Sequence, residues 1–478
     1  FRKSFVEEKT EMIMKKRREI RMENEANKKY LSVPKKIAYG SGDFGSNFFY
    51  MLVSSFMMLY LTDSVGLNAG VVGTLMMVSK LLDGVTDVFF GSLIDKTHSK
   101  MGKARPWMFF SAIPLAISTI LLFCIPESFG ITAQYAYFFV FYTLSNAVFY
   151  TANNIAYATM SARITKNDAE RVSLGSFRCA FAVVASIIVS AMTVILVDNF
   201  GGGAAGWRMV AIIYMIIMFA FSSIASLVCK EIPEEEFEVK MSSNGEIKRA
   251  EKKSFLELLK IIITNKYYLI MLAIYILSYI NTGIGTTSGT YYFKYIMGNP
   301  ALLGVVSMSS MVMIVGLIFN PSLVKKYGMY KVNLVSYIIT AVLSVGVMIA
   351  SYMVNFTGIV VLMFLKAVTM APLMGSLNAL VAEVAKNVYL KKNVQVEGMM
   401  FSCSSLGMKL GSGIGSAAVG WILAAAGYVG TSDIMSAGVI SAIKFIYGAL
   451  PLIVTVLLVV MCWLQKVVEE NQKLVNEK

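Results

Sequence analysis

Long apolar runs alternate with short polar segments along most of this chain of 478 residues. A helix that crosses a bilayer needs roughly 20 predominantly apolar residues, and each run reaches about that length. The runs occupy 36–61, 70–94, 106–125, 132–160, 174–197, 208–229, 267–293, 299–323, 330–353, 356–382, 396–426 and 438–465. The pattern therefore predicts about twelve membrane-spanning helices, in two sets of about six separated by the polar stretch 230–264.

Composition supports the same fold class, because 56% of the residues are hydrophobic and only 15% are charged. Soluble domains carry about a quarter charged residues, and a soluble core could not hide this much apolar surface. We therefore expect an all-α integral membrane protein. The expected parts are a cytoplasmic tail 1–35, a six-helix bundle 36–229, a cytoplasmic linker 230–264, a second six-helix bundle 265–465 and a cytoplasmic tail 466–478.

The net charge of +14 is distributed unevenly between alternate loops. Lysine and arginine gather after the second, fourth, sixth, eighth and tenth runs, whereas the opposite loops are nearly bare, with Arg208 and Lys294 as the main exceptions. Basic loops face the cytoplasm, which predicts a multi-pass protein of the cell membrane with both termini inside. Nucleic-acid binding is not expected, since the basic residues follow membrane sidedness. The tail 1–35 lacks the apolar segment of a cleavable signal peptide.

Few residues offer enzyme or metal-cluster chemistry. The five cysteines are scattered through the apolar runs without paired spacing, and His98, the only histidine, has no co-ligands near it in the sequence. No nucleotide-binding P-loop and no nucleophile–base constellation is recognisable. We therefore expect no enzyme activity, no cofactor and no obligate protein partner, with the lipid bilayer as the surrounding medium.

A weak internal repeat relates the two sets of spans. Residues 91–106 and 321–331 each combine a small-residue turn with a basic cluster, after the second span of their half. Two six-helix halves joined by a central loop form the architecture of the major facilitator superfamily. An acid at the end of a span needs a partner, so these loops predict a cytoplasmic gate between the bundles; an ordinary basic loop is the alternative. The gate candidates are Asp95, Lys103, Arg105 and Arg171.

Two acids inside the second span are candidates for a cation site. Ionisable side chains at bilayer depth cost about 2.5–3.5 kcal/mol each, so they usually mark a pathway. Asp83 and Asp87 lie four residues apart, which puts both carboxylates on one helix face with Thr86 between them. Such oxygen ligands suit Na⁺ or Li⁺, or a proton shared by the two acids. The compatible alternative is a structural ion pair of either acid with Lys80, Arg178 or Lys409.

Four motifs in combination resemble those of one family. They are 39–47 (YGSGDFGSN), 60–67 (YLTDSVGL), 83–87 (DGVTD) and 102–107 (GKARPW). The set is similar to that of the glycoside–pentoside–hexuronide:cation symporters, the group that contains the melibiose permease, and the resemblance covers about 35–465. It implies a major facilitator fold and the import of a sugar together with a cation.

The resemblance also implies roles for individual residues. Asp83, Asp87 and Thr151 match the family's cation site, with Na⁺, H⁺ or Li⁺ as the coupling ion. Thr86 stands where the melibiose permease has an asparagine, so the resemblance does not fix which cation is used. Arg178 and Lys409 match the charged pair on the fifth and eleventh helices.

The sugar-binding positions depart from the melibiose permease. Asn47 and Asn154 stand in place of two sugar-binding aspartates, and two tryptophan positions carry Ala158 and Met374. Neutral asparagine can donate hydrogen bonds to a uronate that buried aspartate would repel, although asparagine also suits neutral glycosides. All four tryptophans lie near span ends, so stacking on a sugar falls to Tyr150, Tyr157 or another non-tryptophan ring, and Lys366 adds positive charge. The substrate-binding candidates are Asn47, Asn154, Arg178, Lys409, Tyr150, Tyr157 and Lys366.

The sequence thus predicts a cation-coupled symporter that imports a glycoside, with hexuronides and pentosides among the candidates, by alternating access. The main alternative is transport of a lysolipid or another organic solute on the same fold. A channel or a sensor is a further alternative. Polar residues expected near the midplane favour a sugar over a lipid; they are Asn47, Thr151, Asn153 and Asn154.

Overall fold

The structure is a computed structural model that describes residues 29–165, 167–233, 260–392, 397–431 and 435–476. Most of the expected tail 1–35, most of the expected linker 230–264 and the last two residues of the expected C-terminal tail lie outside the described residues. Within the described ranges the chain folds almost entirely into helices, and no strand is present there.

The first half of the chain forms six long helical stretches. The opening stretch is continuous and alternates between α and wider π turns. The stretches are α2 (Val33–Met51) with η1 (Leu52–Phe56), α3 (Met57–Leu59) and η2 (Tyr60–Ser64); α4 (Ala69–Lys96); α5 (Arg105–Leu122); α6 (Ile131–Thr143) with η3 (Leu144–Tyr150) and α7 (Thr151–Arg163); α8 (Asp168–Asn199); and α9 (Gly203–Val228).

The second half repeats this plan. Its stretches are α12 (Lys266–Tyr291) with η4 (Tyr292–Ile296); α13 (Leu302–Ser307) with α14 (Ser309–Tyr327); α15 (Met329–Tyr352); α16 (Phe356–Lys392); α17 (Glu397–Ala425); and α18 (Ala437–Lys444) with η5 (Phe445–Ala449) and α19 (Leu450–Leu464). A short helix, α20 (Val467–Asn476), follows.

Eleven of the described helical stretches are long and apolar enough to cross a membrane. The predicted span 132–160 is not among them, although it is helical from Ile131 to Arg163. Its polar side chains, including Asn146, Asn153 and Asn154, explain its low hydropathy, and this helix contributes to the site described below. The prediction of about twelve spans in two six-helix bundles is confirmed.

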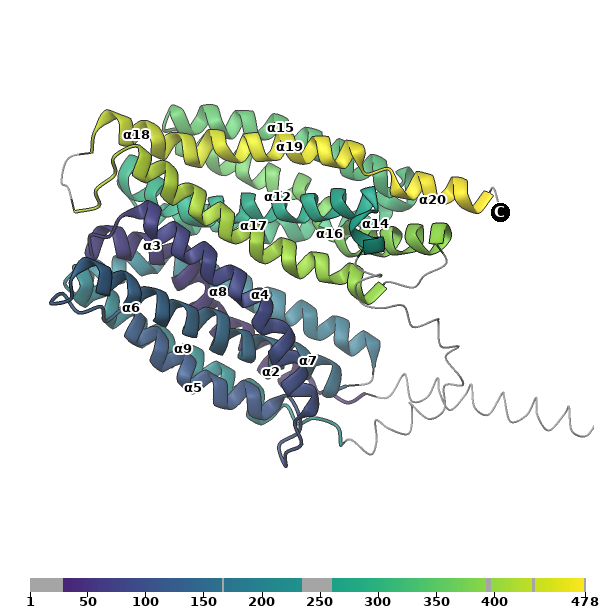
Figure 1. The fold of residues 1–478 in the computed structure, drawn as a ribbon, viewed down its shortest axis with the longest axis horizontal. Coiled ribbons are helices and arrows are strands. Elements are labelled where there is room, and N and C mark those ends of the chain that lie inside the picture. Colours follow the sequence, from purple (N-terminus) through teal and green to yellow (C-terminus); the bar gives the residue numbers. More distant parts are fainter. Residues whose placement is uncertain (1–28, 166, 234–259, 393–396, 432–434, 477–478) are drawn as a thin grey trace, which may run out of the picture.

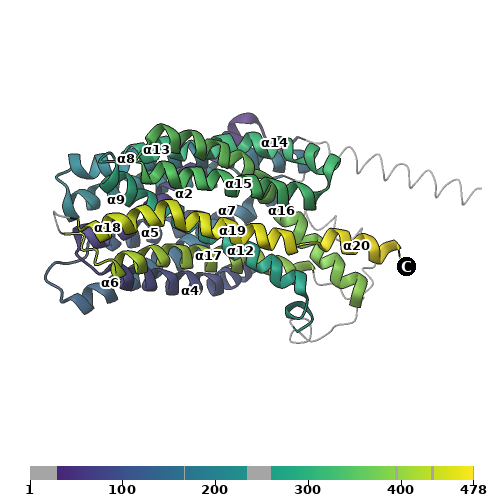
Figure 2. The same cartoon turned by 90° about the horizontal axis from the view of Figure 1, so that it is seen from above.

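The two halves form separate bundles that meet along α4 and α17 (Figures 1 and 2). Glycine permits this approach: a methyl group on Gly420 of α17 would lie 2.4 Å from the carbonyl oxygen of Ala69 on α4. A methyl on Gly73 of α4 would likewise lie 3.0 Å from Cα of Ala417. Close backbone contact between small residues is a usual means of joining helices in membranes.

The bundles lie close together at one end and spread apart toward the end that carries the C-terminus (Figure 1). The π segments η2 and η4 lie at the close end, each finishing the first long helix of its half. A π turn re-aims side chains relative to a regular α-helix and often occurs at functional positions. Both segments contribute to a cluster described below.

Candidate functional site

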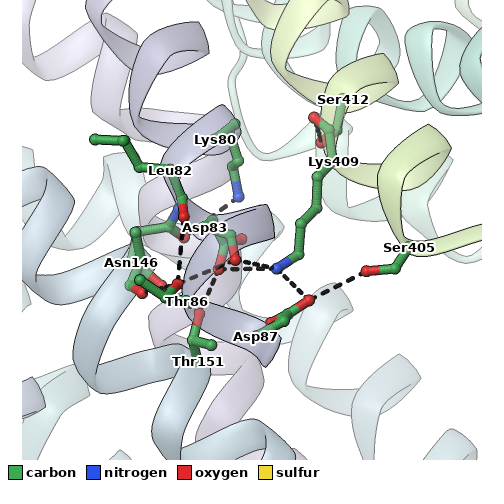
Figure 3. A network of polar contacts seen from close by, with 11 residues as sticks. Lys80, Leu82, Asp83, Thr86, Asp87, Asn146, Thr151, Ser405, Lys409 and Ser412 are labelled. Carbon is green, nitrogen blue, oxygen red and sulfur yellow. Dashed lines mark hydrogen bonds and ion pairs between the residues drawn. The ribbon is translucent and has the colours of Figure 1, made fainter. Parts of the chain in front are cut away.

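Asp83 and Asp87 on α4 share one partner, Lys409 on α17, as Figure 3 shows. The ammonium nitrogen lies 2.5 Å from Oδ2 of Asp87 and 3.1 Å from Oδ1 of Asp83, and it donates to the Asp83 carbonyl at 2.7 Å. Asp83 is buried, with 8% of its surface exposed. We call these three residues the acid–lysine cluster. It joins the two bundles, because α4 belongs to one and α17 to the other.

Hydroxyl groups surround the two carboxylates (Figure 3). Thr151, the first residue of α7, donates to Asp83, and Ser405 of α17 donates to Asp87 at 3.1 Å. Thr86 instead donates to backbone carbonyls, those of Asp83 at 3.0 Å and of Ala147 at 2.5 Å. The two acids lie on one helix face and Thr151 lies beside Asp83, and their role as a cation site stays a prediction.

The cluster has the donor chemistry of a small cation site. The Lys409 ammonium lies close to one oxygen of each carboxylate, and the Thr151 hydroxyl donates to Asp83. Hard cations such as Na⁺ select oxygen ligands. The ammonium therefore occupies a position at which a small cation could bind the same acids.

Lys80 lies one turn before Asp83 and contributes a second positive charge. Its ammonium donates to Oδ1 of Asn146 at 3.3 Å and lies 6.0 Å from the ring centre of Tyr50. The Tyr50 ring in turn stacks beside Tyr150, with 6.3 Å between the ring centres. This series of contacts runs from Lys80, one turn from Asp83, to Tyr150, a predicted substrate-binding residue. Tyr50 lies between them and was not among the residues predicted from the sequence.

Arg178 pairs with Asp43 rather than with the acids of α4. Its Nε lies 2.5 Å from Oδ2 of Asp43, and its guanidinium lies 4.3 Å from the ring centre of Tyr157. The backbone carbonyl of Asp43 accepts a hydrogen bond from Asn47 at 2.8 Å. Tyr157 and Tyr39 each donate a hydroxyl to the other's carbonyl, at 2.6 and 2.8 Å. Three predicted substrate residues, Asn47, Tyr157 and Arg178, therefore lie in one group, the arginine–tyrosine cluster.

Two other substrate candidates have different surroundings. The side chain of Asn154 on α7 is exposed, and the described residues provide no hydrogen-bond partner for it. Lys366 on α16 is buried within the second bundle, at 7% exposure, and no described hydrogen bond, ion pair or ring contact joins it to the other candidates. Asn154 is thus accessible to a ligand, whereas Lys366 lies apart.

The gate candidates near the first basic loop make their described contacts inside the first half. Glu231 accepts hydrogen bonds from the backbone N–H groups of Lys103, Ala104 and Arg105 and from the side chain of Arg163. This carboxylate caps the N-terminus of α5, where unpaired N–H groups favour an anion.

The Arg105 guanidinium donates to carbonyls at the end of α9, and that of Arg171 to the Ala162 carbonyl at 3.2 Å. The side chain of Asp95 lies outside the described residues. The gate therefore stays a prediction.

A third cluster, around Asp63, was not predicted. Asp63 in η2 accepts hydrogen bonds from Lys294 at 2.6 Å, from Tyr428 at 2.5 Å and from Tyr295, and also from Thr62 at 2.8 Å. Its side chain is only 8% exposed. We call these five residues the Asp63 cluster. Asp63 and Thr62 belong to the first half and the other three to the second, so this cluster also joins the bundles.

A signal for this cluster was present in the sequence. Lys294 is one of the two main basic residues in loops that otherwise contain almost no lysine or arginine. Asp63 lies within one of the four family motifs. An isolated acid and an isolated base at the ends of corresponding helices could have been paired on that ground. No local spacing connects them, however, because they are 231 residues apart.

Comparison with known proteins decides the family. The sequence model of a family described as MFS/sugar transport protein matches residues 38–468. The chain belongs to this family. Its members are membrane transporters of the major facilitator superfamily, so the chain is a transporter and not an enzyme.

Three curated relatives of this sugar-transport family member each match 84–94% of its length. An isoprimeverose transporter of Lactiplantibacillus pentosus is 29% identical, over 87% of this chain and 85% of its own. A putative glycoside/cation symporter, YagG of Escherichia coli, is 26% identical, over 94% and 95%. A putative sulfoquinovose importer of Escherichia coli is 26% identical, over 84% and 83%. These names support a small-molecule sugar as cargo and a coupling cation.

Solved structures agree on the fold. The nucleoside transporter NupG matches with a TM-score of 0.62 at 13% identity, over 89% of this chain and 98% of its own. A D-xylose–proton symporter matches with a TM-score of 0.58 at 13% identity, over 88% and 96%. The predicted major facilitator fold is therefore confirmed.

Proposed function

We propose that this protein is a cation-coupled symporter that imports a glycoside by alternating access. The observation that carries the proposal is the acid–lysine cluster. One lysine of the second bundle pairs with two acids of the first, so a cation that binds the acids must compete with a contact between the bundles. Cation binding is thereby linked to the separation of α4 from α17.

The coupling has a definite energetic scale. Moving one positive charge inward across 100 mV releases about 2.3 kcal/mol, which supports roughly fifty-fold accumulation of a neutral solute when coupling is tight. The acids and lysines Lys80 and Lys409 balance in charge when no cation is present, at two of each. A bound cation takes the place of the Lys409 ammonium, whereas Thr151 continues to orient Asp83. Both Na⁺ and H⁺ suit this site.

Sugar recognition is assigned to the arginine–tyrosine cluster and its neighbours. Asn47 and Asn154 offer amide groups, Arg178 offers N–H donors, and Tyr150 offers a ring face, whereas Tyr157 is fully buried and positions Arg178. Relatives are named for isoprimeverose, for glycosides and for sulfoquinovose, which supports a sugar in this position without selecting one. Amides, a guanidinium and hydroxyls match the hydroxyl groups of a sugar better than a lipid tail.

The basic loops support an orientation with both termini in the cytoplasm. The Asp63 cluster then lies at the extracellular end, where it closes the passage between the bundles, and the spread end faces the cytoplasm. The described conformation is inward-open on this assignment. Transport requires the Asp63 cluster to break so that a sugar can enter from outside.

The test is uptake by proteoliposomes of a panel of radiolabelled glycosides, with Na⁺ and pH gradients imposed separately. The wild type should accumulate at least one glycoside uphill under one gradient, and Asp87→Asn should only equilibrate it. Asp198→Asn, the same change at an exposed acid at the end of α8, should retain accumulation. Undiminished uphill uptake by Asp87→Asn, or uptake of a lysolipid without any glycoside, would contradict the proposal.

A further inference from the structure

Lys366 is a buried cation that the proposed transport mechanism does not use. It lies ten residues into α16, about 15 Å along the helix and so near the middle of a hydrocarbon core of roughly 30 Å. Only 7% of its surface is exposed, and no described residue forms a hydrogen bond or ion pair with its ammonium. A charge at this depth is costly unless it is paired, so intramembrane lysines usually have a counter-charge. The described residues provide none.

The Lys366 side chain lines a cavity of about 170 Å³ inside the second bundle. Helices α12, α14, α15 and α16 and the π segment η5 all contribute to its wall. None of the residues that line it is an acid, and Lys366 is the one base among them. The cavity wall therefore carries a single positive charge.

Two further residues of the wall keep hydrogen-bond donors for a ligand. Ser309 begins α14, and its hydroxyl has no hydrogen bond with any described residue. Asn281 of α12 is buried and donates one amide N–H to Oγ1 of Thr455 at 3.2 Å, which leaves its second N–H. The hydroxyls of Thr282 and Ser344 donate instead to carbonyls of their own helices. The unused donors suit a ligand that accepts hydrogen bonds.

The rest of the wall is largely apolar, and it includes Val347, Met363 and Met370. A phosphate or sulfate dianion brings two charges against the one of Lys366, so its burial here leaves a charge unbalanced. A halide brings one charge and accepts hydrogen bonds from any direction. The volume is sufficient for such an ion with a few waters, because a water molecule takes about 30 Å³ in the liquid. Charge and wall chemistry therefore favour a small monovalent anion.

The exposed side of the cavity lies on α12. Thr282 and Gly285 line the cavity and are exposed, and a methyl group on Gly285 would meet nothing within 4 Å. Further along the same helix, Tyr291 lies within hydrogen-bond distance of Thr62 of the first bundle, at 3.0 Å. The cavity is thus open on a helix that also contacts the other bundle.

We propose that this cavity binds a small monovalent inorganic anion, of the class of chloride, as the counter-ion of Lys366. The anion accepts hydrogen bonds from the ammonium, from Ser309 and from Asn281, and so connects α16, α14 and α12 inside the second bundle. The site is separate from the proposed cation and sugar sites. It therefore stands or falls independently of the symport proposed above.

The experiment measures the line width of chloride by NMR with the purified full chain, since exchange with a protein site broadens the line. Spectra are recorded for the wild type, Lys366→Gln and Ser309→Ala. Lys325→Gln removes an exposed lysine at the end of α14 and is the control for chloride attracted by surface charge. Bromide and sulfate are titrated as competitors in exchange for glutamate, so that the Na⁺ concentration stays constant.

We expect the wild type to broaden the chloride line saturably, and bromide to remove this broadening far more effectively than sulfate. Lys366→Gln should weaken chloride binding about tenfold or more, the usual effect of losing a hydrogen bond to a charged group. Ser309→Ala should weaken it about threefold, as expected for a neutral hydrogen bond. Lys325→Gln should bind chloride like the wild type.

Equal saturable broadening by the wild type and folded Lys366→Gln, or equal losses in Lys366→Gln and Lys325→Gln, would overturn the proposal. Sulfate that competes as well as bromide would contradict a site for a monovalent anion. If Lys366→Gln does not fold, wild-type affinity retained in Ser309→Ala would overturn the site. Uphill glycoside uptake by a wild type that binds no chloride would refute this inference and leave the proposed symport intact.

Discussion

The acid–lysine cluster and the Asp63 cluster both connect an acid of the first bundle to a lysine of the second. They differ in how many hydrogen-bond donors serve each carboxylate. Asp63 is one carboxylate that receives four donors, from Thr62, Lys294, Tyr295 and Tyr428. In the acid–lysine cluster, one ammonium serves two carboxylates. A carboxylate that receives four donors suits a closure, whereas two carboxylates that share one ammonium suit exchange of one cation for another.

The largest expected effect concerns coupling. Lys409→Gln removes the group that cation binding must displace, so the cation site can fill without releasing α17 from α4. We expect the roughly fifty-fold uphill accumulation of a neutral glycoside to fall to equilibration, whereas exchange across the membrane continues. Uptake and counterflow in proteoliposomes measure the two activities. Unchanged accumulation would show that Lys409 has no part in coupling.

The next effect concerns the closure. Asp63→Asn removes the counter-charge of Lys294, whose side chain is 31% exposed, and so weakens the ion pair that joins the two bundles at this end. We expect the outer ends of the bundles to separate more often and uphill uptake to fall about tenfold or more. Spin labels at Glu127→Cys and Val429→Cys, which are exposed on opposite halves, report the separation.

Introducing Asp63→Asn into the spin-labelled protein should lengthen the distance between the two labels. A distance that does not respond would mean that the Asp63 cluster does not hold the closed end together.

A smaller effect is expected in the arginine–tyrosine cluster, which lies within the first bundle. Arg178→Lys keeps the charge but loses the forked donor geometry toward Asp43 and the stacking over Tyr157. We expect KM for the transported glycoside to rise about tenfold, with the cation dependence unchanged. Cation activation curves distinguish this result from a loss of coupling, which would show instead as a shifted cation dependence.

The smallest effect is expected for Glu170, a carboxylate whose hydrogen bonds all lie within the first bundle. Desolvation raises the pKa of Glu170, but hydrogen bonds from Thr165 and from the backbone N–H groups of Leu31 and Tyr30 outweigh it and lower the pKa below the ordinary value. A lowered folded-state pKa stabilises the protein above the ordinary glutamate pKa, near 4.3, and the gain is lost as the pH falls through the folded value.

Glu170→Gln should therefore lower Tm slightly at neutral pH and reduce the loss of Tm on acidification below about pH 4, with coupling intact. Melting curves at a series of pH values, with uptake measured alongside, test this. We expect only carboxylates that join the two bundles to take part in coupling. A loss of uphill uptake in Glu170→Gln would contradict this, because Glu170 makes its hydrogen bonds within the first bundle.

Local patterns allowed most of the fold to be predicted, because span length and loop charge depend on neighbouring residues. The acid pair Asp83 and Asp87 was found for the same reason, since a four-residue spacing fixes a shared helix face. The partner of Arg178 was not found, because Asp43 is 135 residues away and Asp83 was an equally plausible partner from sequence. The Asp63 cluster joins residues up to 365 positions apart, so it depends on how the bundles meet.

The central claim is that the coupling cation and the Lys409 ammonium compete for Asp83 and Asp87. Calorimetric titration of purified wild type and Lys409→Gln with Na⁺ and Li⁺, and of proton uptake across a pH series, tests it most directly. The account predicts that the coupling cation binds Lys409→Gln at least tenfold more tightly, because its competitor is gone. Equal or weaker binding of every cation to Lys409→Gln would contradict it.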